Sequence, residues 1–161
     1  MIIRGVALCY GDDISTDEII PGPYLQYDSP EKLASFAMRG CDTTFPEKSK
    51  NAILVVGKNF GCGSSREQAA ICLKHAGIQS IIGVSFARIF YRNAINQGLP
   101  LLQSSSACEM ISNGDEIKIT LETGEIENIS TQKQIQSTPP APFLTSILKA
   151  GGAIPWFHQQ K

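Results

Sequence analysis

A glycine-rich turn carries the side chains of this sequence that are best suited to chemistry. It spans residues 57–67 and presents Ser64, Ser65 and Arg66 directly after the small residues 61–63. The turn follows an apolar run and leads into a helical pattern, so free backbone N–H groups and the helix dipole would attract an anion. The guanidinium of Arg66 can hold a carboxylate through two parallel hydrogen bonds. The pattern therefore predicts a site for a small acid, with a hydroxyl group beside the reacting atoms.

An ordinary helix start is the alternative explanation of the same residues. Ser64 or Ser65 would then be the N-cap, and Glu67 would only favour the first helical turn. Two nucleotide-binding motifs fit poorly. A Walker loop ends in Gly-Lys-Ser/Thr, whereas Lys58 stands at the beginning of this turn, and a dinucleotide fingerprint has glycine where Arg66 stands. The residues alone leave the capping and the chemical interpretations open.

Periodicity places this turn within a chain of alternating strands and helices. We expect strands at residues 2–9, 53–56, 79–84, 99–102, 116–121, 125–129 and 153–157. We expect helices at residues 30–38, 65–75, 86–97 and 143–149, and a proline-rich connector at residues 137–142. The sixth and fifth strands would form a hairpin about Thr123-Gly124. This order predicts an α/β domain with a mixed sheet or a partly closed barrel flanked by helices.

Composition narrows the classes of function. With 161 residues, 42% of them hydrophobic and 18% charged, the chain suits one globular domain with a substantial core. A net charge of −1 and a pI near 6.1 argue against binding to nucleic acid or to an anionic membrane. No apolar run is long enough to span a bilayer, and the start lacks a signal-peptide pattern, so we expect a cytoplasmic protein.

Cysteine and histidine usage argues against a metal site built by this chain alone. The five cysteines are scattered without a Cys-x-x-Cys pair, and there are only two histidines. The shortage of histidine also removes the usual base that activates a serine. A second polar loop contains Asp12, Asp13 and Asp17, which could orient catalytic groups or bind a cation, although turn-forming side chains explain them equally well.

Four segments, in order along the chain, resemble the small subunits of isopropylmalate isomerases, members of the aconitase superfamily. They are residues 11–21, 59–67, 85–99 and 147–152. The resemblance covers nearly the whole chain. It implies that residues 1–161 form one swivelling β/β/α domain, the small subunit of a two-subunit hydro-lyase.

The resemblance also implies a reaction, a partner and a cofactor. The enzyme would interconvert 2-isopropylmalate and 3-isopropylmalate by dehydration and rehydration in leucine biosynthesis. A large subunit, in a heterodimer or heterotetramer, would carry a 4Fe-4S cluster, and this chain would carry no cofactor. The substrate would be a small dicarboxylic hydroxy acid.

Matched motif by motif, the resemblance assigns roles to four residues. Ser64 would be the general base, Ser65 and Arg66 would hold the substrate carboxylate, and Asp17 would orient Arg66 or the substrate. One departure is Gln68, which stands where many relatives have histidine. Gln68 cannot titrate, so we expect it to give structural support only.

A second departure concerns the loop in which the family selects its substrate. The loop consists of Tyr24, Leu25, Gln26 and Tyr27. Members that act on tricarboxylic substrates carry an arginine there, whereas this segment has none, which suits an alkyl group. Alternatively, Tyr24 and Leu25 only pack the loop against the protein. The rival functions are a related hydratase for citraconate and methylmalate, dimethylmalate or homoaconitate, and a non-catalytic module that binds a dicarboxylate.

Overall fold

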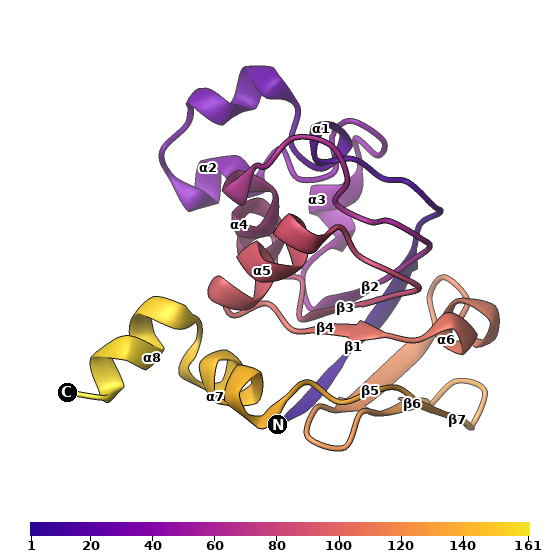
Figure 1. Ribbon diagram of the computed structural model, residues 1–161. Coiled ribbons are helices and arrows are strands. Elements are labelled where there is room, and N and C mark those ends of the chain that lie inside the picture. The colour runs from indigo at the N-terminus through magenta and orange to yellow at the C-terminus, as the bar shows by residue number, and fades with distance from the viewer.

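The computed structural model describes residues 1–161 and is built on a mixed seven-stranded sheet (Figure 1). The strand order is β4-β3-β2-β1-β5-β6-β7. The strands are β1 (Ile2–Cys9), β2 (Ala52–Val56), β3 (Ser80–Gly83), β4 (Leu101–Gln103), β5 (Glu116–Thr120), β6 (Glu125–Asn128) and β7 (Lys133–Gln136). Strands β1 to β4 pair in parallel, whereas β5, β6 and β7 continue the sheet from β1 in antiparallel pairs. The predicted fold class, a mixed and partly closed sheet with flanking helices, is confirmed.

Short helices connect the strands and cover the sheet. They are α1 (Thr16–Ile19), the 3-10 helix η1 (Gly22–Gln26), α2 (Pro30–Ala34), α3 (Phe45–Lys48), α4 (Glu67–His75), α5 (Arg88–Asn96), α6 (Ser105–Met110), α7 (Pro142–Ala150) and α8 (Ala153–Gln159). Helix α4 joins β2 to β3, and α5 joins β3 to β4, which are the crossovers that parallel strands need. No helix is long and apolar enough to cross a membrane.

The strand β2 shows how the core is organised. All five of its residues are buried, because each face of the sheet is covered. Leu54 and Val56 belong to a cluster beneath α2, α4 and α5, whereas Ile53 and Val55 belong to a second cluster beneath α6 and α7. Burial on both faces explains why this strand reads as a continuous apolar run rather than an alternating one.

The prediction of a strand at residues 153–157 is wrong, because these residues form the first part of helix α8. Gly151 and Gly152 have φ angles of 89° and 132°, and this left-handed pair turns the chain out of α7 into a new helix. Pro155 lies in the first turn of α8, where its missing N–H costs little. Trp156 packs edge-on against Phe143, with ring centroids 5.2 Å apart.

Several further elements differ from the sequence prediction. The predicted helix at residues 30–38 ends as α2 at Ala34, and the chain continues in turns to Met38, which has a φ of 57°. The short elements α1, η1, α3, α6 and β7 were not predicted. In β7 only Ile135 is buried, so its sequence lacks the alternation that marks a strand.

Candidate active site

The loops that follow β1, β2 and β3 meet at the carboxyl edge of the parallel strands. The N–H of Gly61 donates to the carbonyl of Ile14 at 2.8 Å, which joins the first two loops. The N–H of Phe60 donates to the carbonyl of Ser85 at 3.1 Å, which joins the second loop to the third. Ligand sites in open α/β sheets form at this edge. The hydrogen bonds therefore place the glycine-rich turn where a small molecule would bind.

Two glycines allow the turn to pass close to α5. Gly61 and Gly63 have φ angles of 81° and 90°, which residues with a side chain rarely adopt. A Cβ atom at Gly61 would also overlap the buried ring of Phe90 on α5. The turn and α5 can therefore form two walls of a single cavity.

The two serines precede the helix and do not cap it. Helix α4 begins at Glu67, its N-cap is Arg66, and no side chain makes a capping hydrogen bond there. Ser64 and Ser65 are exposed, and no hydrogen bond within the chain engages either hydroxyl. The capping interpretation is therefore wrong for both serines, and the predicted helix start at residue 65 lies two residues early.

Thr16 fixes the backbone of the serine turn. It is 2% exposed, its Oγ1 donates to the carbonyl of Ser64 at 2.9 Å, and its N–H donates to the carbonyl of Cys62 at 2.8 Å. Thr16 begins α1, where Ser15 and Glu18 form a reciprocal capping box. The sequence prediction missed Thr16, although the Ser-x-x-Glu spacing around it signals a rigid helix start.

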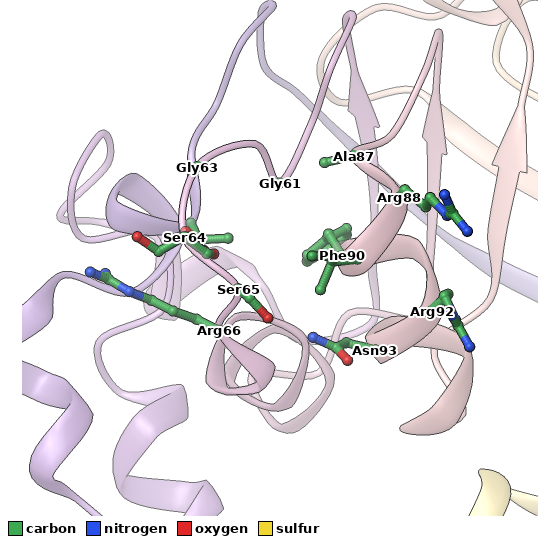
Figure 2. A pocket seen from close by; sticks show the side chains of 12 residues that line it. Gly61, Gly63, Ser64, Ser65, Arg66, Ala87, Arg88, Phe90, Arg92 and Asn93 are labelled. Carbon is green, nitrogen blue, oxygen red and sulfur yellow. Dashed lines mark hydrogen bonds between the residues drawn. The ribbon is translucent and has the colours of Figure 1, made fainter.

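Arg66 forms an ion pair with Asp17, as one of the two predicted roles of Asp17 requires. The Nη1 atom of Arg66 also donates to the carbonyl of Ile20 at 3.1 Å. The Arg66 side chain is only 19% exposed, whereas that of Asp17 is 63% exposed. In Figure 2 the guanidinium of Arg66 points away from Ser65. Asp17 and Ile20 thus hold Arg66 on the α1 side of the turn.

A cavity of about 430 Å³ opens between the serine turn and α5. The lining residues are Thr16, Gly61, Gly63, Ser64, Ser65, Arg66, Ala87, Arg88, Ile89, Phe90, Arg92 and Asn93. Figure 2 shows Ser65 and Asn93 facing one another across it. Sequence reasoning assigned roles to the serine wall but none to the α5 wall, although α5 lies within residues 85–99, one of the four segments that resemble the family.

The predicted substrate-selecting loop lies outside the cavity lining. Residues 24–27 form most of η1 and its end. Tyr24 stacks on Phe36 with ring centroids 4.0 Å apart, and Tyr27 stacks on the same ring at 5.5 Å. The guanidinium of Arg39 lies 5.7 Å from the centroid of the Tyr24 ring. The segment therefore packs against an aromatic neighbour, and a cation stands beside it although none occurs within it.

The chain does not fit a metal ion or an iron–sulfur cluster. No three His, Cys, Asp or Glu side chains gather where they could hold a metal. Burial raises the pKa of the Cys9 and Cys41 thiols to about 11, and it also raises the pKa of Cys72 and Cys108. Without a metal, these four thiols are therefore protonated near neutral pH.

Comparisons with known proteins identify the family. The model of the aconitase C-terminal domain matches residues 24–106. The 3-isopropylmalate dehydratase small subunit of Pyrobaculum calidifontis is 51% identical over 160 residues, which cover 99% of each chain. The chain belongs to the family of 3-isopropylmalate dehydratase small subunits. Another member, the isopropylmalate/citramalate isomerase small subunit of Methanocaldococcus jannaschii, is 49% identical over 99% of this chain and 95% of that one.

A solved structure of the same family has the same fold as this chain. The crystal structure of 3-isopropylmalate dehydratase from Methanocaldococcus jannaschii matches with a TM-score of 0.94 and 46% identity, over 99% of this chain and 95% of that one. The resemblance to the family and the enzyme class, a hydro-lyase subunit, are confirmed. The designation of the relatives as small subunits implies a large-subunit partner.

Proposed function

We propose that this chain and a large subunit interconvert 2-isopropylmalate and 3-isopropylmalate, a step of leucine biosynthesis in the cytoplasm. The cavity carries this proposal, because its lining combines two free serine hydroxyls with Arg66, which is paired with Asp17, at the carboxyl edge of the sheet. The names of the relatives supply the substrate. A free hydroxyl beside a carboxylate-binding cation suits removal of a proton next to a carboxylate.

Ser64 acts as the general base in this proposal. Its alkoxide takes the proton from the carbon next to a carboxylate, the released electron pair forms the carbon–carbon double bond, and the hydroxyl group of the neighbouring carbon leaves as hydroxide. Hydroxide then adds to the carbon that lost the proton, and Ser64 returns its proton to the carbon that lost the hydroxyl, which restores the alkoxide. A serine alkoxide is costly near neutral pH, so the backbone N–H groups around residues 63–65 must stabilise it. Thr16 holds that backbone in place.

Ser65 and Arg66 hold the substrate carboxylate. Arg66 uses Nη1 to contact Asp17 and Ile20, which leaves other N–H groups of its guanidinium fork for a ligand. Asp17 is mostly exposed, so it can also adjust its contact when substrate binds. In this role Asp17 orients Arg66 and does not exchange protons with the substrate.

The large subunit supplies what this chain lacks. The side chains described above do not fit an iron–sulfur cluster, so we assign the 4Fe-4S cluster to the large subunit. Residues 1–161 would swivel as one domain over that subunit and close the cavity, which excludes water from the reaction. The assembly would be a heterodimer or a heterotetramer.

Tyr24, Leu25, Gln26 and Tyr27 select the substrate in this proposal. They lie outside the cavity lining of this chain, so they would reach the substrate only when the domain closes over the large subunit. Their segment is neutral and partly apolar, which favours an alkyl substituent over a third carboxylate. In an apolar substrate pocket, a methylene-sized difference is worth roughly 1–3 kcal/mol. A second substrate, citramalate, is favoured by one observation, namely that the relative from Methanocaldococcus jannaschii is named for both isopropylmalate and citramalate.

An anaerobic hydratase assay tests the proposal. The chain is mixed with the cluster-loaded large subunit of its own organism and offered 2-isopropylmalate, citraconate and homoaconitate, with each subunit alone as a control. We expect turnover of isopropylmalate only in the mixture, with citraconate as the second substrate. Turnover of homoaconitate alone would mean that our substrate is wrong, and it would make Arg39 and Lys32 the candidates for the cation that residues 24–27 lack. An intact complex that turns over none of the three would favour a non-catalytic binding module.

A further inference from the structure

Two arginines form an exposed cationic surface on the rim of the cavity. Arg88 is the first residue of α5, and Arg92 lies one turn further along the helix. Both are exposed, and no ion pair or hydrogen bond within the chain engages either guanidinium. Figure 2 shows both side chains pointing away from Ser64 and Ser65. Ile89, which is 51% exposed, adds an apolar side chain to the same rim.

This arrangement conflicts with two rules of local helix stability. Arg88 stands at the N-terminus of α5, where the helix dipole disfavours a cation, and the first turn contains no acidic residue. Arg88 and Arg92 are also four residues apart, where like charges repel. No neighbouring acid offsets either cost. A local conflict without a stabilising contact is typical of a residue that is retained for function.

The composition of this surface suits a protein better than a small acid. Arginine is enriched in protein interfaces, whereas a dicarboxylate has no use for an exposed isoleucine. The arginines also point away from the serine hydroxyls. If the cavity is half of an active site, the subunit that completes it must also approach the rim, because Arg88, Ile89 and Arg92 border the same cavity as the serine turn.

We propose that Arg88, Ile89 and Arg92 form part of the docking surface for the large subunit and face acidic residues there. This inference rests on the proposed function, which requires a second subunit over the cavity. The overall charge of the chain is −1, so the cationic rim is a local feature and not a consequence of a basic protein. Complementary charge at such a rim speeds association and fixes the orientation of the subunits.

The experiment measures association of this chain with the cluster-loaded large subunit, for Arg88→Glu and Arg92→Glu. Arg4→Glu is the matched control, because it makes the same charge change at an exposed position on β1, outside the cavity lining. We expect the Kd to rise about tenfold or more for the two α5 variants, with most of the change in the association rate. The difference should shrink at high salt. Arg92→Gln should give a smaller loss of the same sign.

Several readouts separate the possible outcomes. The Tm of Arg88→Glu should not fall, since an acidic residue suits the start of a helix. Because Arg88 and Arg92 also line the cavity, the KM for isopropylmalate at saturating large subunit is measured separately from association. If Arg88→Glu and Arg92→Glu bind the large subunit as tightly as Arg4→Glu does, the proposed docking surface is wrong and the proposed function is unaffected. A raised KM with normal association would show that the arginines bind substrate, which also overturns the inference. Failure of the unmodified chain to bind the large subunit would overturn both proposals.

Discussion

At the scale of single residues, the free hydroxyl of Ser64 is the feature on which the proposed chemistry depends. Ser64 and Ser65 are both exposed and lie side by side in the sequence, so composition does not distinguish them. Their backbone contacts do, because Thr16 holds the carbonyl of Ser64 and no residue holds that of Ser65 through a side chain. The better-fixed serine is the better candidate for a positioned base.

Replacing Ser64 with alanine should abolish most turnover and leave assembly intact. A positioned general base contributes about 10²- to 10⁴-fold to rate, so we expect kcat to fall by that range. Steady-state kinetics of the assembled enzyme check this, with Ser65→Ala as the matched variant. Ser65→Ala should raise the KM more than it lowers kcat, because Ser65 is assigned to carboxylate binding. Equal kcat for Ser64→Ala and the unmodified enzyme would mean that another group removes the proton.

Thr16 should act as a positioning residue. Thr16→Val keeps the shape of the side chain but removes the hydrogen bond to the carbonyl of Ser64, so the serine turn loses its side-chain anchor. We expect kcat to fall with little change in KM, and the free energy of unfolding to fall by about 1 kcal/mol. Thr16→Ser restores the hydroxyl and should recover most of the activity. If Thr16→Ser is as slow as Thr16→Val, the methyl group matters and not the hydrogen bond.

At the scale of elements, the loop after β1 is anchored through Asp42. Tyr10, at the start of that loop, donates its hydroxyl to Asp42 at 2.6 Å, and Lys48 on α3 forms an ion pair with the same carboxylate at 2.7 Å. Thr44 adds hydrogen bonds from its N–H and its hydroxyl. Partial burial of Asp42 acts in the opposite direction, but these four contacts outweigh it and hold the pKa of Asp42 well below its usual range.

The lowered pKa of Asp42 predicts that this residue contributes to the free energy of unfolding at neutral pH and contributes much less in acid. A carboxyl whose pKa is lower in the folded state contributes stability above its unfolded pKa of about 4, and the contribution is lost as pH falls through the folded value. Asp42→Asn should therefore lower the free energy of unfolding by about 1–2 kcal/mol near neutral pH. Denaturant titrations across the acid range should show the two proteins converging as the pH falls. A gap that stays constant with pH would mean that the carboxylate charge has no part in the anchor.

At the scale of the whole molecule, Lys74 joins helices that belong to different parts of the core. It lies in the last turn of α4, and its Nζ donates to the carbonyls of Gln97, at the end of α5, and of Gly151, at the end of α7. Burial lowers the pKa of Lys74. A cation at helix C-termini is favoured by the dipoles and satisfies carbonyls that lack helical partners. The contact connects α4, over one face of the sheet, to α7, over the other.

Lys74→Met should lower the stability of the whole domain. The substitution retains the apolar stem but leaves two carbonyls without their donor, so we expect a loss of about 1–3 kcal/mol. Thermal unfolding measures this, with Lys133→Met as the control at an exposed position on the edge strand β7. A Tm for Lys74→Met equal to that of the control would show that Lys74 does not hold the two faces together.

The sequence by itself determined the parallel half of the sheet, the family and the serine turn. Strand β1 was predicted to the residue, because an aliphatic run bounded by a polar loop permits one assignment. The serine turn was found because local chemistry defines it: glycines permit its shape, and Ser64, Ser65 and Arg66 are consecutive.

Only the tertiary structure decided what surrounds the turn and what the ambiguous segments become. The local pattern of residues 153–157 is also compatible with a short strand. In the structure these residues are helical, and Trp156 packs against Phe143. Thr16 and Asn93 are far from the turn in sequence and reach the cavity only because the crossovers of a parallel sheet bring its loops to one edge. Likewise Arg39 stands beside Tyr24 through folding alone, since fifteen positions separate them in the sequence. Long-range contacts of this kind follow from the burial of both faces of the sheet, and no local pattern encodes them.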